Sequence, residues 1–218
     1  AVFTVSSHLD TNDAKNGDGI CADVSGNCTL RAAVQESNSL TSADTINFSP
    51  SGGATVSLVL GEIFITDSLI IDGANNLSIN ANNQSRILNI QRGGISVVIR
   101  NLTVTNGRTG DYGGGIYAAA GDLTIENTAI RNCFAQMNGG GIYSGNGVFR
   151  LLNSTVENNI VAVNGGSGGV SVNGNNSEIR NSRIIRNSAP RGGGVLIGSY
   201  TTKISETFIS ENTASIGG

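Results

Sequence analysis

Acid–base chemistry in this chain would come from carboxylates and arginines, because His8 is its only histidine. That single histidine, near the N-terminus, excludes a Ser–His or Cys–His pair in the rest of the chain. Glycoside hydrolysis commonly uses two carboxylates that face one bond. One hypothesis therefore places an acidic and basic groove at Asp111, Glu126 and Arg131. Under this hypothesis the chain is a polysaccharide lyase or a glycoside hydrolase.

Metal binding is the second chemistry that the residue types allow. The segment DTNDAKNGDGICAD, residues 10–23, is rich in side-chain oxygens, which Ca²⁺ prefers as ligands. The candidate ligands are Asp10, Asn12, Asp13, Asp18 and Asp23. The segment has no acidic residue at the closing position of a twelve-residue calcium loop. A disulfide loop rich in Asx turns, without a metal, is the alternative.

The three cysteines point to a small disulfide loop. Cys21 and Cys28 are close in sequence, with ADVSGN between them, and a disulfide between them is the favoured interpretation. A metal-binding pair is disfavoured because the chain has one histidine and one further cysteine. The disulfide indicates an oxidising compartment. Cys133 is predicted to be a buried free thiol.

The elements that would position these residues come from an internal repeat. Five related segments are RNLTVTNG, ENTAIRNC, LNSTVENN, RNSRIIRN and ETFISENT, and GGGIY occurs at 113–117 and 139–143. Apolar and polar residues alternate within each unit, which predicts strands. Short strands with Gly and Asn turns, repeated about every 25 residues, predict a parallel β-helix with about three strands in each coil. The fold class is therefore all-β.

A β-helix stacks equivalent residues of successive coils about 4.8 Å apart, so the repeat predicts ladders. The leading asparagines Asn101, Asn127, Asn153 and Asn181 should form one ladder, and Tyr117 should stack on Tyr143. A charged ladder is predicted from Arg131, Glu157, Arg186 and Glu211. Opposite charges on neighbouring strands attract each other, so this structural role competes with the catalytic hypothesis for Arg131.

Residues 1–48 do not repeat and are predicted to cap the N-terminal end of the β-helix, which occupies residues 49–218. Open strand edges at the end of a β-helix need such a cover. The segment TLRAAVQESN, residues 29–38, is the one good helix candidate, with Thr29 as N-cap. We expect this helix to lie over the open apolar end of the first coil.

The segment GDGICADVSGNCTLRAAVQESN resembles the CSLREA motif at the start of many secreted or surface β-helix proteins of bacteria and archaea. The resemblance continues through ITDSLIIDG, SRILNI and GGGIY in the same order. A looser likeness joins the GG–Ile coils to the repeats of chlamydial polymorphic outer-membrane proteins. The resemblance implies a right-handed β-helix that is secreted or on the cell surface. Ala32 stands where the family has the Glu of its capping box, which weakens the expected helix start.

Composition limits the partners. The net charge of −3 gives no basic footprint for nucleic acid, and no apolar run approaches the roughly 18 residues of a membrane span. The chain stops at ENTASIGG, where earlier coils go on into another strand. We therefore expect an unfinished last coil that either continues or docks on a neighbouring copy, so that subunits assemble head to tail.

Two functions follow from these patterns. The first is a non-catalytic extracellular or cell-surface β-helix, such as an adhesive or structural scaffold or fibre, with glycans or surface components as partners. The second is the carbohydrate-active enzyme with the groove at Asp111, Glu126 and Arg131. Ca²⁺ is the one cofactor that the sequence suggests.

Overall fold

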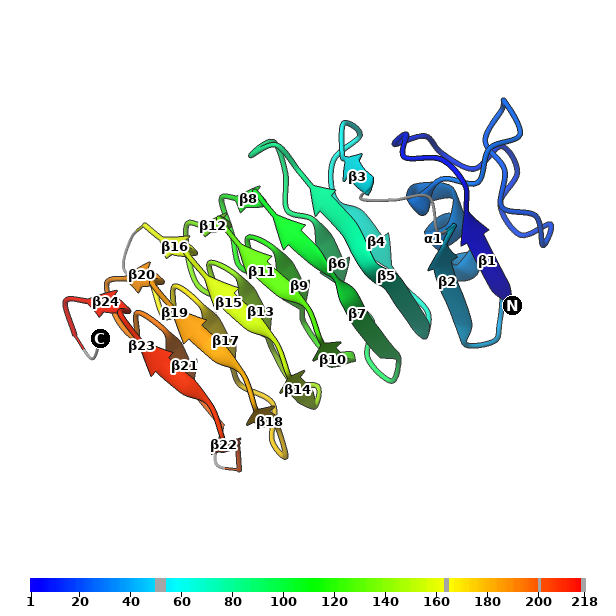
Figure 1. Ribbon diagram of the computed structural model, residues 1–218. Helices are drawn as coiled ribbons and strands as arrows, with labels where there is room; N and C mark the ends of the chain where they lie inside the picture. The colour runs from blue at the N-terminus through cyan, green and yellow to red at the C-terminus, as the bar shows by residue number, and fades with distance from the viewer. Residues whose placement is uncertain (50–53, 163–164, 200, 217–218) are drawn as a thin grey trace.

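The computed structural model describes residues 1–49, 54–162, 165–199 and 201–216. In this part of the chain, one helix and three parallel sheets form, and their strands stack in succession from the N-terminal end to the C-terminal end (Figure 1). Neighbouring strands of each sheet come from successive turns of the chain. The predicted all-β parallel β-helix with a short N-terminal helix is confirmed.

The strands of the described residues divide among three sheets. The thirteen-stranded sheet contains β1 (Val2–Val5), β2 (Asp44–Phe48), β3 (Ala54–Ser57), β5 (Leu69–Asn80), β7 (Ser96–Thr105), β10 (Asp122–Glu126), β11 (Ala129–Arg131), β14 (Phe149–Leu152), β15 (Thr155–Glu157), β18 (Glu178–Arg180), β19 (Arg183–Ile185), β22 (Lys203–Ser205) and β23 (Phe208–Ser210). The six-stranded sheet contains β4 (Ile63–Ile65), β6 (Leu88–Ile90), β9 (Ile116–Ala118), β13 (Ile142–Ser144), β17 (Val170–Val172) and β21 (Val195–Ile197). The five-stranded sheet contains β8 (Arg108–Thr109), β12 (Phe134–Ala135), β16 (Ile160–Val161), β20 (Ser188–Ala189) and β24 (Thr213–Ala214).

A regular coil has four short strands rather than the three that the sequence suggests. In one coil the chain passes through β10 and β11 of the thirteen-stranded sheet, then β12 and β13 of the two smaller sheets. The extra strand arises because a bend divides the first segment of the coil. In β7 the two halves are still one strand, whereas β10 and β11 are separate.

The bends are residues in the left-handed backbone conformation. The first bend of successive coils falls at Asn101, Asn127, Asn153, Asn181 and Glu206, with φ between 47° and 59°. The second bend falls at Asn106, Asn132, Asn158, Arg186 and Glu211, with φ between 55° and 57°. Asparagine is the non-glycine residue that adopts this conformation most readily, which explains its recurrence in the repeat. The Arg and Glu residues at equivalent positions adopt it at a cost of about 1 kcal/mol.

After four of the five first bends the next residue carries a hydroxyl group: Thr128, Ser154, Ser182 and Thr207. Ser154 Oγ accepts a hydrogen bond from the backbone amide of Thr128 at 3.1 Å, and Ser182 Oγ accepts one from the amide of Ser154 at 3.2 Å. Thr207 continues this hydroxyl ladder into the next coil. The hydroxyls of Ser154, Ser182 and Thr207 therefore each accept from a backbone amide of the preceding coil.

After the last three second bends the next residue is an asparagine, and Asn159, Asn187 and Asn212 form an amide ladder whose first two members are fully buried. Asn159 Oδ1 accepts from the amide of Cys133 at 2.9 Å, and Asn187 Oδ1 accepts from the amide of Asn159 at 3.0 Å. Asn212 extends the ladder to Asn187 at 2.9 Å. Cys133 stands at the start of this ladder as a buried free thiol, as the sequence predicts. Burial raises the pKa of this thiol to about 12, so it is protonated at neutral pH.

The apolar core fills the space between the three sheets. Inward residues of β10, Leu123 and Ile125, lie in register with Phe149 and Leu151 of β14, and all four are fully buried. The intervening side chains point outward, which gives the period of two read from the sequence. Core residues therefore form columns along the axis.

The repeated glycine cluster is explained by a close approach between coils. Gly113 and Gly139 adopt φ of 64° and 62°. A Cβ atom on Gly114 would lie 2.4 Å from the carbonyl oxygens of Gly140 and Phe134, which is too close for any side chain. Glycine is required here both for the turn and for the contact with the next coil.

The N-terminal segment joins the β-helix through both strands and helix. β1 pairs with β2 and β2 pairs with β5, so residues 2–5 and 44–48 extend the thirteen-stranded sheet. Helix α1 (Leu30–Ser39) packs against β1, β2 and β4 and buries Leu30, Ala33 and Val34. Among the described residues, no helix has the length and apolar character needed to cross a membrane.

Candidate functional site

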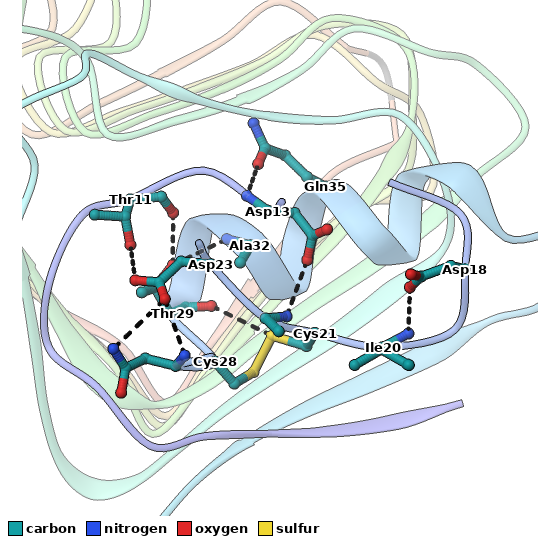
Figure 2. Close-up of a disulfide and its surroundings, with 12 residues drawn as sticks. Thr11, Asp13, Asp18, Ile20, Cys21, Asp23, Cys28, Thr29, Ala32 and Gln35 are labelled. Atoms are coloured by element: carbon teal, nitrogen blue, oxygen red, sulfur yellow. Dashed lines mark hydrogen bonds between the residues drawn. A yellow bond between two sulfur atoms is a disulfide. The ribbon is translucent and has the colours of Figure 1, made fainter. Parts of the chain in front are cut away.

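The predicted disulfide between Cys21 and Cys28 is confirmed, with the two sulfur atoms 2.02 Å apart (Figure 2). It links the N-terminal loop to the start of α1. Thr29 Oγ1 accepts from the amide of Ala32 at 3.1 Å and donates to the carbonyl of Thr11 at 2.7 Å. The N-cap residue Thr29 and the neighbouring Cys28 therefore both fasten the N-terminal loop to the start of α1.

The acidic side chains of this loop form turns with nearby backbone amides. Asp18 Oδ1 accepts from the amide of Ile20 at 2.9 Å, and Asp13 accepts from the amides of Lys15 and Ala22 at 2.8 Å and 3.1 Å. Asp23 accepts from the amides of Ser25 and Asn27. The Asn27 amide, followed by the Thr11 hydroxyl, lowers the pKa of Asp23 below its usual value. Figure 2 shows the Asp18–Ile20 contact, with Asp13 and Asp23 beside the disulfide.

The five candidate calcium ligands have separate hydrogen-bond partners. Asn12 Oδ1 accepts from the side chain of Gln35, and Asp10 lies against Arg31. Within the described ranges, no group of three His, Cys, Asp or Glu side chains is arranged to hold a metal ion. The Asx-turn alternative describes the geometry of the loop, and calcium binding by Asp10, Asn12, Asp13, Asp18 and Asp23 stays a prediction.

Asp10 and Arg31 form a buried ion pair that joins the N-terminal segment to the coils. Arg31 Nε donates to Asp10 Oδ1 at 2.6 Å. Asp10 Oδ2 also accepts from the amides of Val59 and Leu60 at 2.7 Å and 2.8 Å. Arg31 Nη2 donates to the carbonyl of Gly61 at 2.6 Å. The Asp10 carboxylate is thus paired with the Arg31 guanidinium and with two backbone amides of the segment before β4.

The leading asparagines lie in one column and are joined in pairs. Asn127 Nδ2 donates to Asn101 Oδ1 at 3.3 Å, and Asn181 Nδ2 donates to Asn153 Oδ1 at 2.7 Å. Asn101 in turn donates to Asp72 Oδ1 at 2.9 Å. Burial raises the pKa of Asp72, but the hydrogen bonds from Asn101 and Ala74 and the charge of Arg100 outweigh it, so the pKa is lowered.

The structure places the residues of the predicted charged ladder in two columns rather than one. Arg131 lies in register with Glu157, but Ile185, not Arg186, lies in register with Glu157. Arg186 and Glu211 occupy the left-handed second bend, where earlier coils have asparagine. The side chain of Arg186 still reaches both neighbours, with Nη2 2.7 Å from Glu157 and Nη1 3.4 Å from Glu211.

The three residues of the catalytic hypothesis come from separate parts of the coil. Glu126 ends β10 and Arg131 ends β11, both in the thirteen-stranded sheet, while Asp111 lies in the loop between β8 and β9. No hydrogen bond or ion pair among the described residues connects them. Glu126 lies in register with Arg100, whose guanidinium donates to Asp72 at 2.8 Å. The structure therefore does not assemble these residues into one site.

Three tyrosines gather on the outward side of the six-stranded sheet. Tyr117 and Tyr143 lie in register, with ring centroids 5.5 Å apart, as the ladder predicts. Tyr112, from the loop before β9, lies 4.8 Å from the Tyr143 ring and 6.4 Å from the Tyr117 ring. These three residues are called the tyrosine cluster. Burial, followed by the neighbouring Tyr117 and Tyr112, raises the pKa of Tyr143.

Arg86 holds the loop that carries Tyr112. Its side chain is largely buried, and Nη1 lies 2.6 Å from Glu62 Oε2. Nη2 donates to the carbonyl of Tyr112 at 2.9 Å, and Nε donates to the carbonyl of Gly113 at 3.0 Å. The Arg86 Cζ atom also lies 4.9 Å from the centroid of the Tyr117 ring, within range of a cation–π interaction.

Two hollows that share Gly110 adjoin the tyrosine cluster. The first, of about 570 Å³, is lined among others by Tyr112, Gln136, Met137, Asn138, Arg191 and Leu196. The second, of about 490 Å³, is lined among others by Glu62, Phe64, Gln84, Arg86 and Arg108. The two hollows together are called the side groove. Its lining comes from the turns before β4, β6, β9, β13, β17 and β21 and from β4, β8 and β21 themselves, so it follows the axis over successive coils.

The side groove combines apolar surface with hydrogen-bond donors. Phe64 and Met137 are 51 % and 45 % exposed, and Gln136 and Arg191 are exposed beside them. In the part of the chain that the structure describes, Arg191 has no acidic partner. Such a surface can hold a ligand that has apolar faces and polar edges.

The sequence interpretation missed several of these residues. Tyr112, Glu62 and Arg86 do not recur at the repeat period, so the ladder pattern gave no sign of them. Glu36 was also missed: it is buried in α1 and accepts from the amides of Gly17, at 2.5 Å, and Gly19. The one available signal was Tyr112 immediately before the first GGGIY, without a counterpart in the second.

The comparisons with known proteins concern the coils. The model of the family described as right handed beta helix region matches residues 86–217, which is more than half of the chain. No curated protein and no solved structure matches the chain. The matched residues contain the regular coils, the tyrosine cluster and most of the side groove. The chain therefore belongs to the right-handed β-helix family.

Proposed function

We propose that this chain is a non-catalytic extracellular or cell-surface scaffold that adheres to its target through the side groove. The observation that carries the proposal is the groove itself. Aromatic, amide and guanidinium groups from successive coils face the two hollows that meet at Gly110. A surface of this kind suits an extended ligand that contacts several coils at once.

The positions of the charged residues support a scaffold. Arg186 lies between Glu157 and Glu211 of the adjacent coils, and Arg100 lies against Asp72 of the preceding coil. These contacts cross from one coil to the next on the thirteen-stranded sheet or at the bend that follows it. Exposed ion pairs contribute only about 0.5 kcal/mol each, but they align the coils and offset repulsion between like charges.

Two observations support an extracellular or surface location. The Cys21–Cys28 disulfide suits an oxidising compartment. The N-terminal segment resembles the CSLREA motif of secreted and surface β-helix proteins. The family match to the coils is compatible with both.

Glycans are the ligand class that the groove chemistry favours. Aromatic rings such as Tyr112 and Phe64 pack against the apolar faces of sugars, while Gln136, Asn138 and Arg191 can donate to sugar oxygens. Other surface components that combine apolar faces with hydrogen-bond acceptors are the alternative partners.

A glycan array tests this proposal. We expect retention of the wild-type chain on a subset of glycans, and a loss of at least about tenfold in affinity for Tyr112→Ala/Arg191→Ala, since each tenfold corresponds to about 1.4 kcal/mol of contact energy. Arg150→Ala is the matched control, because Arg150 is exposed on β14 in a different sheet. Equal binding by the groove variant and the control would refute the groove as the adhesive surface.

A carbohydrate-active enzyme is the second candidate, and Asp111 is the observation that favours it. Asp111 precedes Tyr112 and lies close enough to Tyr143 for its charge to contribute to raising the pKa of that tyrosine. A screen on acidic and neutral polysaccharides separates the candidates. Turnover that Asp111→Asn abolishes would establish the enzyme, whereas retained turnover in Asp111→Asn would exclude this residue as its acid or base.

Self-association also stays a prediction. Ile204, Phe208 and Ile209 of the last described coil are between 38 % and 54 % exposed, and they would suit an apolar contact with a second copy. Light scattering over a concentration series tests this. A growing mass would support head-to-tail assembly, and a strict monomer up to millimolar protein would refute it.

A further inference from the structure

We infer that Tyr112 and Tyr143 form a site for oxidative crosslinking, in which a carbon–carbon bond joins their rings and ties two successive coils together. The inference is independent of the proposed function. It rests on the geometry of the tyrosine cluster and on the charges around it.

The first observation is proximity. The ring centroids of Tyr112 and Tyr143 are 4.8 Å apart with an interplanar angle of 45°, the shortest separation in the tyrosine cluster. Tyr143 is fixed in β13, and the loop that carries Tyr112 is held by the hydrogen bonds from Arg86. Two rings held in this way have a high effective concentration for each other.

The second observation is partial exposure. Tyr112, Tyr117 and Tyr143 are each half-buried rather than enclosed. The tyrosine rings can therefore transfer electrons to an oxidant at the surface, and their hydroxyl groups can transfer protons to water. The chain has no tryptophan and only four tyrosines, so few other aromatic side chains can supply electrons.

The third observation selects the pair. The Arg86 guanidinium lies 4.9 Å from the centroid of the Tyr117 ring, and a positive charge at this distance disfavours loss of an electron from that ring. The negative charge of Asp111 acts instead on Tyr143. Tyr143 therefore couples with Tyr112 rather than with Tyr117, although Tyr117 is its partner in register.

The reaction balances with a peroxidase and hydrogen peroxide. Each phenol loses one electron and one proton and becomes a phenoxyl radical. The two radicals couple through ring carbons next to the phenolic oxygens, and each coupled carbon returns its hydrogen to the adjacent oxygen as the ring becomes aromatic again. The protein loses two hydrogen atoms in total, and the two electrons and two protons reduce one hydrogen peroxide to two waters.

The test is treatment of the dilute, folded chain with a haem peroxidase and hydrogen peroxide. We expect dityrosine fluorescence in the monomer, loss of two hydrogen atoms by intact mass, and a crosslinked peptide pair that contains Tyr112 and Tyr143. The same treatment can oxidise Met137, which is 45 % exposed. This adds an oxygen atom, and the gain in mass distinguishes it from the crosslink, which loses two hydrogen atoms.

Phenylalanine variants make the test specific, because they keep the ring packing. Tyr112→Phe and Tyr143→Phe should each lower the yield of monomeric dityrosine by at least about tenfold, since the loss of one ring removes the effective concentration of the pair. Tyr117→Phe should crosslink as the wild type does. Equal yields in urea-unfolded and folded protein, an unchanged yield in Tyr112→Phe, or loss of the crosslink in Tyr117→Phe would overturn the assignment.

Discussion

Asparagine has two roles at the left-handed bends of the coils, one through its backbone and one through its side chain. Asparagine recurs at both bends because its backbone tolerates this conformation. At the first bend of four coils its side chain also takes part in hydrogen bonds between coils, as from Asn127 to Asn101. Sequence spacing was sufficient to predict this column, because the residue type and the period agree.

The charged residues show where residue-level prediction fails. The charged-ladder prediction places Arg186 next to Glu157 because an asparagine follows each of them in the sequence. In the coil of Arg186 that following residue, Asn187, is the buried ladder residue and not the bend. An asparagine can serve at the bend or inside, and composition alone does not distinguish the two roles.

At the residue scale, Asp72 should make stability depend on pH in acid. Its pKa is lowered from 3.8 in the folded chain, so its contribution is complete above that value and is lost as pH falls through the lower folded pKa. Asp72→Asn should therefore be less stable than wild type at pH 7, by less than about 1 kcal/mol because its partner Arg100 is well exposed and solvent screens the pair.

Urea unfolding at pH 7 and at several values below 3.8 measures this effect. The difference between wild type and Asp72→Asn should shrink as pH falls. Asp67→Asn is the control, because among the described residues Asp67 accepts only from the neighbouring amide of Ser68. A difference that stays constant over the whole range would show that the Asp72 carboxylate does not act through its charge.

At the scale of elements, alternation and turn residues were enough to predict strands, coils and the N-terminal helix. They were not enough to predict the fourth strand of each coil, because a single left-handed residue divides a segment whose polar and apolar alternation is otherwise continuous. The inward hydroxyl and amide ladders were missed for a related reason. Ser154 and Asn159 are polar and look like turn residues, but both are buried and satisfy backbone amides.

The amide ladder should be more important for stability than the exposed asparagine column. Asn187→Ala leaves the amide of Asn159 without its acceptor in the core, which should cost about 1 to 3 kcal/mol. Asn181→Gly is the matched control, because it removes an exposed amide while glycine tolerates the left-handed backbone, and it should cost only a few tenths of a kcal/mol. Thermal or urea unfolding compares the two, and equal losses would contradict a special role of the buried ladder.

The contact between the N-terminal segment and the coils should depend on the buried Asp10–Arg31 pair. Asp10→Ala and Arg31→Met should each destabilise the chain by about 3 to 5 kcal/mol, because each leaves the other charge buried without its partner. Asp10→Ala/Arg31→Met should be less destabilised than the sum of the two single variants. Strict additivity in this cycle, measured by urea unfolding, would mean that the two side chains do not interact.

At the scale of the whole molecule, the fold was predictable and the candidate site was only partly so. The repeat determines a β-helix, and the Tyr117–Tyr143 pair follows from it. Tyr112, Arg86 and Glu62 come from turns of three different coils and meet only because the coils stack. Their positions depend on turn conformation, which the repeat does not specify, so the side groove could not be predicted from spacing.

The central claim is that the side groove binds its ligand without changing it. The most direct measurement is the chemical state of a glycan that the array selects, after prolonged incubation with wild-type protein at a concentration that saturates binding. Product analysis by mass spectrometry should recover the glycan intact, while titration shows binding that Tyr112→Ala/Arg191→Ala weakens. Cleaved or eliminated glycan, formed by wild type and not by Asp111→Asn, would contradict the scaffold and establish an enzyme.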